Sequence, residues 1–216
     1  MTSTDKAKAR RGRPANEALQ GTIVGAAGNL FLEHGFQSTT MDKVAKCAGI
    51  SKLSIYRHFP SKEALFSAAI ARKCQEFAPD TLFIGTQGTP ADRLLAAGEG
   101  MLWLLMSDEA RGVEAMIVAD AANRNQLAQL YYEAGPKRIV AQIEELLRQL
   151  ELEGHISIPD PELAARMFAA LFKGSDILMR RQLDPETPVD PAAARAYCRY
   201  AVERFLTAHP PASAGT

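Results

Sequence analysis

The stretch STTMDKVAKCAGISKLSIYRHFP, residues 38–60, decides the fold. Its spacing predicts two short helices: Gly49 ends the first, Ser51 begins the second and Pro60 stops it. Two helices joined by a tight glycine turn form a helix-turn-helix, whose second helix enters the DNA major groove. This second helix has many hydrogen-bond donors and little core, which suits a surface that contacts base edges and phosphates.

Apolar residues recur at helical spacing along almost the whole chain, so we expect an all-α protein. Its parts would be an N-terminal three-helix DNA-binding domain with the helix-turn-helix and a larger C-terminal helical bundle. Thr39 would cap the second helix together with Asp42, and a domain boundary would lie near the breaker-rich residues 78–90. Helices are expected over 16–35, 39–49, 51–58, 61–77, 91–106, 109–122, 124–154 with a kink at Gly135-Pro136, 161–183 and 191–208.

The charge is divided along the chain, although the net charge is zero. Residues 1–64 hold ten Lys and Arg against five Asp and Glu, which predicts a basic module that meets an anion. The segment KAKARRGRP, residues 6–14, has five basic residues, and its last four residues, RGRP, resemble the core of AT-hook segments. Arg10, Arg11 and Arg13 would then enter the DNA minor groove, and the alternative is a solvated tail.

Composition favours a folded protein of the reducing cytoplasm. With 47% hydrophobic residues, the 216-residue chain can bury a core. Cys47, Cys74 and Cys198 have neither disulfide nor metal spacing, and we expect no cofactor. No apolar run follows the basic N-terminus as in a signal peptide, and none is long enough to span a bilayer, so we expect no membrane partner.

Lys62 lies in the first turn of a helix, where the macrodipole disfavours a cation. A phosphate bound at that helix end would make the cation favourable there, because it would place a negative charge beside the lysine. We therefore expect Lys62 to contact the DNA backbone, with Thr39 and Thr40 serving a neighbouring phosphate.

The ordered pattern from Ala26 to Phe66 resembles the TetR family of one-component transcriptional regulators. The resemblance lies in the Phe-x-x-x-Gly-Phe turn, the Thr-Thr helix start, VAKCAGIS, IYRHF and SKEALF. Leu53 departs from the family, which often has Gly there. The resemblance implies binding to double-stranded operator DNA through Thr40, Lys43, Ser51, Lys52, Ser54, Tyr56, Arg57, His58 and Lys62.

Residues 110–181 look like the C-terminal domain of the AefR-like subgroup, whose larger domain binds a small molecule. The resemblance implies a homodimeric repressor with a palindromic operator and a small apolar or amphipathic effector. The expected domains are the basic flexible arm 1–14, the helix-turn-helix domain 15–62, the connecting helix 63–78, the ligand-binding and dimerisation domain 79–209 and the tail 210–216. Candidate ligand residues are Met101, Trp103, Leu104, Met116, Tyr131, Met167, Phe168 and Phe172, all of which could instead be plain core.

Two other function classes are weighed against this interpretation. An enzyme is disfavoured because the sequence has no HExxH, GxSxG, P-loop or CxxC motif, and its four histidines lack ligand spacing. A thiol redox sensor on the same fold would use Cys47, where the neighbouring Lys46 favours the thiolate. A free cysteine is more often a small buried hydrophobe.

Overall fold

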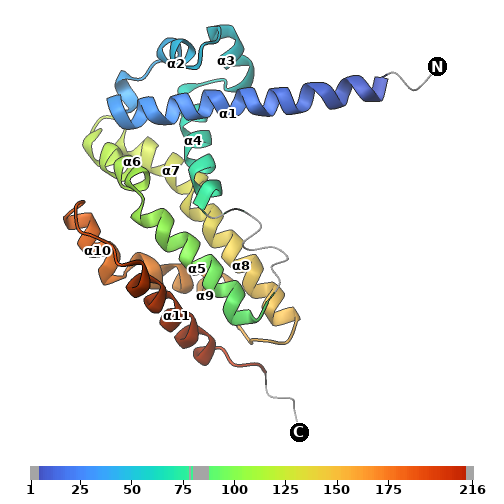
Figure 1. Cartoon of the computed structure of the whole chain (residues 1–216), viewed down its shortest axis with the longest axis vertical. Coiled ribbons are helices and arrows are strands. Elements are labelled where there is room, and N and C mark those ends of the chain that lie inside the picture. The colour runs from blue at the N-terminus through green and yellow to red at the C-terminus, as the bar shows by residue number, and fades with distance from the viewer. Residues whose placement is uncertain (1–4, 78, 80–87, 213–216) are drawn as a thin grey trace. The chain divides into compact units, whose positions relative to one another are not determined.

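A computed structural model describes residues 5–77, 79 and 88–212, with only the backbone for residues 5–15. The described residues form helices and no strand, which confirms the all-α prediction (Figure 1). The helices are α1 Asp5–Ser38, α2 Met41–Ala48, α3 Lys52–His58, α4 Lys62–Phe77, α5 Pro90–Met106, α6 Asp108–Ala119, α7 Arg124–Ala134, α8 Pro136–Leu152, α9 Pro161–Lys173, α10 Asp176–Leu183 and α11 Pro191–Ala208.

The helices group into two compact units that divide the chain differently from the expected domains. Unit 1 comprises Met1–Arg72 and Gly112–Ala134, and unit 2 comprises Lys73–Arg111 and Gly135–Thr216. Unit 1 therefore contains α7 and most of α6 besides the helix-turn-helix. Two helices, α4 and α6, contribute residues to both units.

The core of unit 1 is built on three aromatic rings. Phe31, Phe36 and Phe66 lie with ring centroids 5.5–5.7 Å apart, and all three are buried. Gly35 brings the rings together because it breaks the helical path of α1 at φ 77°, a conformation that glycine adopts without strain. This core fixes the end of α1 beside the start of α4.

The two threonines before α2 have different roles, and the expected Thr39 cap is wrong. Thr40 is the N-cap, since its hydroxyl accepts from the Lys43 N–H at 3.2 Å. Thr39 is fully buried, and its hydroxyl lies 2.8 Å from the Gly35 carbonyl and 3.0 Å from that of Leu30. The buried hydroxyl therefore donates back to α1 at its kink, so it does not cap α2.

The turn of the helix-turn-helix follows the sequence prediction. Gly49 ends α2 in the left-handed conformation at φ 68°, and its N–H donates to carbonyls of the last turn. Ser51 caps α3, accepting from the Ser54 N–H at 3.1 Å. Ile55 is fully buried and anchors α3, Ser54 and His58 are half-buried, and the other residues of this short helix are exposed.

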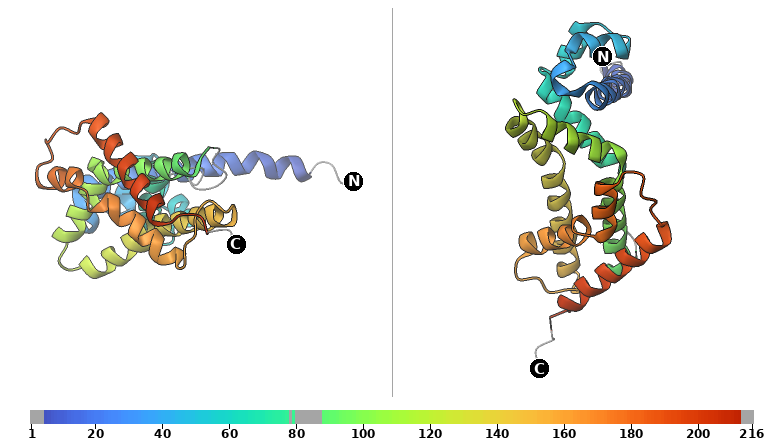
Figure 2. Two further views of the ribbon diagram at one scale, coloured as in Figure 1. Left: turned by 90° about the horizontal axis from the view of Figure 1, so that it is seen from below. Right: turned by 90° about the vertical axis from the view of Figure 1, so that its left-hand side faces the viewer.

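Unit 2 is a helical bundle around one apolar core. Helix α9 packs against α8 and α5, and α11 packs against α5 and α9 (Figure 2). Phe168 and Phe172 are fully buried at its centre, with ring centroids 5.1 Å apart. The Phe172 ring occupies the space that a side chain at Gly98 would need, because a Cβ there would lie 2.4 Å from Phe172 Cζ.

Two expected helices are each divided in the structure. At residues 124–154, Gly135 has non-helical angles and Pro136 starts a new helix, so the kink is a complete break. The expected helix over 161–183 ends at Gly174, and the buried Ser175 caps α10 by accepting from the Leu178 N–H at 3.3 Å. The first helix also begins at Asp5, well before residue 16.

Candidate nucleic-acid interface

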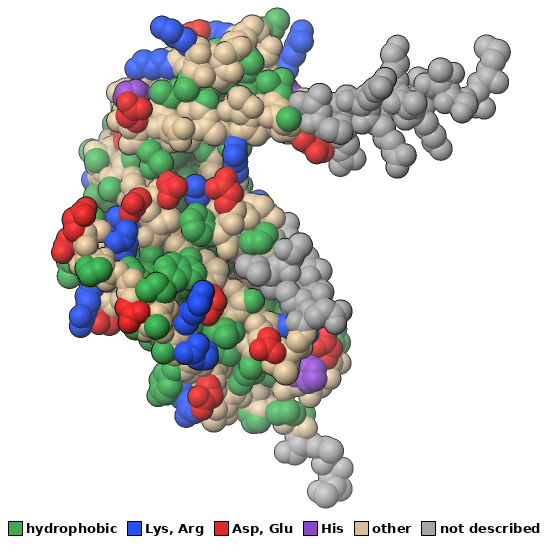
Figure 3. Space-filling view, in the orientation of Figure 1, with side chains coloured by type: hydrophobic (Ala, Val, Ile, Leu, Met, Phe, Trp, Pro, Cys, Tyr) green, Lys and Arg blue, Asp and Glu red, His purple; other side chains and the backbone are tan. Residues whose placement is uncertain are grey.

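Helices α2 and α3 with their N-caps carry most of the predicted DNA residues, and Lys62 lies in the first turn of α4. Figure 3 shows Lys and Arg side chains projecting over these helices. Leu53 is 65% exposed on α3, so an apolar side chain lies among the polar ones. Six of the predicted residues are exposed, namely Thr40, Lys43, Ser51, Lys52, Tyr56 and Arg57, and Ser54, His58 and Lys62 are half-buried.

Several of these side chains are already oriented by neighbours within unit 1. Lys52 forms a 2.7 Å ion pair with Asp42, which joins α3 to α2. Hydrogen bonding to Asp42 raises the pKa of Lys52, so its ammonium stays charged at neutral pH. The Lys43 ammonium donates to the Ser38 carbonyl at 2.7 Å, and His58 Nδ1 lies 3.3 Å from the Gln20 amide. The helix-turn-helix is thus braced internally before any DNA is present.

Lys62 has protein partners that the sequence did not reveal. Its ammonium donates to the Phe36 carbonyl at 2.7 Å and lies 4.2 Å from the centroid of the Phe36 ring. Burial lowers the pKa of Lys62, while the negative charges of Glu63 and Asp120 act in the opposite direction. These contacts account for a cation at this helix end, so the macrodipole argument alone does not require a phosphate.

The predicted ligand residues fall in different units. Met116 and Tyr131 belong to unit 1, where Met116 lines an open groove of about 750 Å³ between the end of α1 and α6, and Tyr131 donates to Glu114 at 3.1 Å. The other candidates belong to unit 2. Met101, Leu104, Phe168 and Phe172 are buried in its core, Trp103 is half-buried against that core, and Met167 is 55% exposed on α9.

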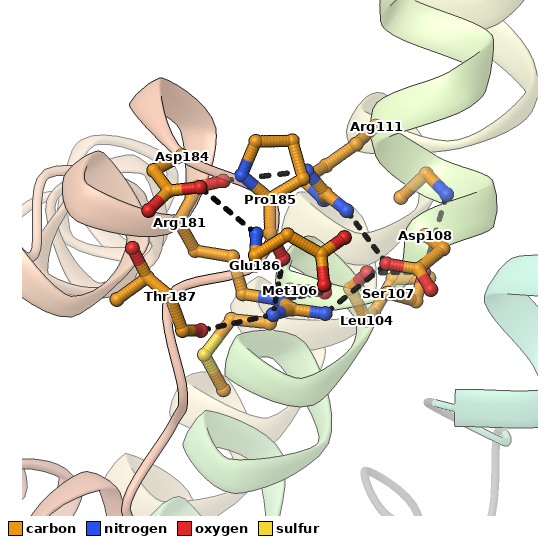
Figure 4. Close-up of polar contacts among 11 residues, drawn as sticks. Leu104, Met106, Ser107, Asp108, Arg111, Arg181, Asp184, Pro185, Glu186 and Thr187 are labelled. Carbon is orange, nitrogen blue, oxygen red and sulfur yellow. Dashed lines mark hydrogen bonds and ion pairs between the residues drawn. The ribbon is translucent and has the colours of Figure 1, made fainter.

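A polar cluster at the start of α6 was not foreseen (Figure 4). The Arg181 guanidinium on α10 donates to the carbonyls of Met106, Pro185 and Thr187 and to the Asp108 carboxylate, at 2.8–3.2 Å. Arg111 also donates to Asp108, at 2.6 Å, and chiefly through this bond the pKa of Asp108 is lowered. The cluster fixes the first turn of α6 to α10 and to the loop that follows it.

Two further residues that the sequence did not indicate, Asp120 and Gln37, meet near the opposite end of α6. Asp120 follows the last turn of α6, and its carboxylate lies 3.4 Å from the Gln37 amide nitrogen, which donates to it. Both residues line the groove of unit 1. They are 83 positions apart, and no motif in the sequence indicates that α6 packs against the end of α1.

The thiols have different environments, which yields a test of the redox alternative. Cys47 is exposed on α2, whereas burial raises the pKa of both Cys74 and Cys198 to about 11. At pH 8 only about one in a thousand of such thiols is ionised. With 5,5′-dithiobis(2-nitrobenzoic acid), we expect one fast thiol per native chain and two more only after denaturation. The fast phase should vanish in Cys47→Ser, and its persistence would contradict this assignment.

Neither a metal site nor a membrane span is found in the part of the chain that the structure describes. No group of three His, Cys, Asp or Glu side chains there could hold a metal ion. None of the described helices combines the length and the apolarity that crossing a bilayer requires.

Family models match two parts of the chain. Residues 23–69 match the model described as bacterial regulatory proteins of the tetR family, and this segment contains α2 and α3. Residues 92–210 match the model described as the AefR-like transcriptional repressor C-terminal domain. The second match alone covers more than half of the chain.

Individual proteins agree with these models. The chain is 28% identical over 155 residues to the uncharacterized HTH-type transcriptional regulator YdeS of Bacillus subtilis. The matched residues make up 70% of this chain and 76% of YdeS. Its fold is similar to that of the Flavonoid-responsive Regulator FrrA (TM-score 0.68, 27% identity, 91% and 100% of the two chains). It is also similar to a TetR transcriptional regulator from Agrobacterium tumefaciens (TM-score 0.70, 25% identity, 89% and 95%). The chain therefore belongs to the TetR family of DNA-binding transcriptional regulators and has an AefR-like C-terminal domain.

Proposed function

We propose that this regulator is a ligand-responsive repressor that binds a palindromic operator as a homodimer and is released by a small apolar effector. The observation that carries the proposal is α3, a short helix with one fully buried anchor, Ile55, and polar side chains facing outward. Such a helix contributes little to a core and much to a groove surface. The function would be carried out in the cytoplasm, where the DNA is.

Lys62 fits a phosphate contact as well as its protein contacts. An ammonium group has three N–H donors, and the carbonyls of Phe36 and Gln37, at 2.7 and 3.5 Å, engage two of them. The third donor remains for a phosphate oxygen. The Phe36 ring and the carbonyls would then orient Lys62 toward the DNA backbone, in line with the family resemblance.

A homodimer is supported by apolar side chains exposed on consecutive helices of unit 2. Leu163 and Met167 on α9 are each more than half exposed, and so is Tyr200 on α11. Met179 and Leu183 on α10 are 55% and 82% exposed. Exposed apolar side chains on several helices favour a protein partner, and the two halves of a palindrome require two recognition helices roughly 34 Å apart, which a homodimer would supply.

The buried aromatic side chains of unit 2 would suit an apolar, flat effector, which would have to displace some of them to enter. Phe168 lies within 5.1 Å of both the Phe172 and the Phe205 ring centroids, and Tyr197 lies 6.5 Å from Phe172. Aromatic rings favour stacked or edge-on partners, and the neighbouring Met101 can adapt its shape. FrrA, which resembles this chain in sequence and fold, is described as responsive to flavonoids. A flavonoid is therefore the first probe to try.

Trp103 is the only tryptophan and lies half-buried against this core, so its fluorescence can test the proposal. We would titrate naringenin, with decanoate as a non-aromatic comparison, in the absence and presence of saturating operator selected from a random duplex library. Linkage requires DNA to weaken effector binding by the factor by which the effector weakens DNA binding. Equal naringenin affinity in both titrations would refute the release of DNA by this effector. A monomeric protein in sedimentation velocity would refute the proposed homodimer.

The basic arm gives a separate prediction. Deleting residues 1–13 should lower operator affinity and remove a preference for A·T-rich flanks, because Arg10, Arg11 and Arg13 would no longer reach a narrow minor groove. The side chains of this arm lie outside the described residues, so this role stays a prediction. Fluorescence anisotropy can measure the affinity for operators with A·T-rich and with G·C-rich flanks. Equal affinities of the truncated and full chains would show that the arm is only a solvated tail.

A further inference from the structure

Asp120 and Lys62 are charges placed at unfavourable helix ends within unit 1. Lys62 lies in the first turn of α4, where the macrodipole is positive, and Asp120 follows the last turn of α6, where it is negative. Each charge destabilises its own helix end, and each has the sign that compensates the other. Such a pairing calls for a reason beyond the stability of either helix.

Gln37 connects the two charges through its two ends. Its backbone carbonyl accepts from the Lys62 ammonium at 3.5 Å, and its side-chain amide donates to Asp120 Oδ1 at 3.4 Å. Gln37 belongs to the last turn of α1, which leads directly into α2. The three residues thus join α6, α1 and α4 at the base of the helix-turn-helix.

The Asp120 carboxylate is held in place and kept ionised. It accepts from the backbone N–H of Asn123 and from its side-chain amide, all at 3.1 Å. The Asn123 side chain does most to lower the pKa of Asp120, and Gln37 and the charge of Lys62 act in the same direction. A fixed anion therefore lies near enough to act on the charge of Lys62, the group that the proposed function assigns to a phosphate.

We propose that Asp120 is a positioning residue for DNA binding, whose carboxylate competes with a backbone phosphate for the Lys62 ammonium. It attracts Lys62 toward the end of α1 and away from the phosphate, so it lowers the affinity of unit 1 for DNA. Since Asp120 terminates α6, any displacement of that helix changes the competition. The inference rests on the proposed phosphate contact of Lys62.

The test uses the full chain and a fluorescein-labelled 30-base-pair duplex of random sequence at several KCl concentrations. Asp120→Asn should bind about threefold more tightly at low salt, the size expected for one exposed charge pair, and the gain should shrink as salt rises. Asp184→Asn makes the same change in net charge within unit 2 and is the matched control. Asp120→Ser, which keeps an oxygen near Asn123, should shift affinity in the same direction if Asp120→Asn folds poorly.

A double-mutant cycle separates the inference from the proposed function. Lys62→Met alone should weaken binding and reduce the salt slope by about one unit. In the Lys62→Met background, Asp120→Asn should have no effect, because the group it competes for is gone. If Asp120→Asn still tightens binding in the Lys62→Met background, the inference is overturned while the Lys62 contact stands. The same conclusion follows if Asp120→Asn tightens binding only as much as Asp184→Asn. If Lys62→Met leaves binding unchanged, both fail.

Discussion

Gly98→Val is expected to lower the free energy of unfolding by about 2–3 kcal/mol, the cost of overpacking a well-packed core. A Cβ at position 98 would lie 2.4, 2.7 and 3.2 Å from three atoms of the Phe172 ring. That ring cannot withdraw easily, because it is fully buried and packed against Phe168 and Tyr197. Replacing a glycine within a helix normally raises the free energy of unfolding. A lower value for Gly98→Val would therefore show that the steric conflict with Phe172 outweighs this gain.

Urea unfolding followed by circular dichroism at 222 nm would measure the change, which corresponds to a melting temperature lower by roughly 5–10 °C. Phe172→Leu alone should cost about 1–2 kcal/mol by leaving space. The double variant should be about as stable as Phe172→Leu, since the valine then occupies that space. Additive losses in the double variant would show that the two positions do not conflict.

Arg57→Ala should reduce affinity for the selected operator about 10- to 100-fold, while binding to a scrambled duplex falls far less. Arg57 is exposed in the last turn of α3, beside Tyr56, which is 44% exposed. A bidentate arginine contact to a guanine edge contributes about 1–3 kcal/mol of discrimination. Loss of a phosphate contact would instead weaken both duplexes alike.

Competition anisotropy with operator and scrambled duplexes at one fixed salt concentration would separate these outcomes. Arg199→Ala, which removes one exposed arginine from α11 in unit 2, controls for net charge. Equal losses on both duplexes with Arg57→Ala would assign Arg57 to the DNA backbone. An unchanged affinity of Arg57→Ala for both duplexes would show that Arg57 does not contact DNA.

The helix-turn-helix could be predicted from sequence because its determinants are local. Gly49 and Ser51 act within one or two turns of their own positions, and each has the expected role. The Thr39 prediction failed because two adjacent threonines can both cap, and only the carbonyls at the kink in α1 decide between them. Local sequence offers no signal for that choice.

Contacts between distant segments could not be predicted from the sequence. Arg181 reaches Asp108 across 73 positions and Gln37 reaches Asp120 across 83, and long polar side chains of this kind are ordinary on any helix surface. The division of residues 161–183 at Ser175 was also missed, because Gly174 is tolerated within many helices. The apolar periodicity on both sides of that break is the same.

The close fit of Gly98 and Phe172 restricts how this regulator can evolve. A larger residue at position 98 is tolerated only together with a smaller ring or an aliphatic side chain at position 172, so the two positions should covary among relatives. Each permitted pair would give the centre of unit 2 a different shape. Under the proposed function, a change of effector specificity among relatives would then proceed through coupled substitutions, with a less stable ancestor between the two forms.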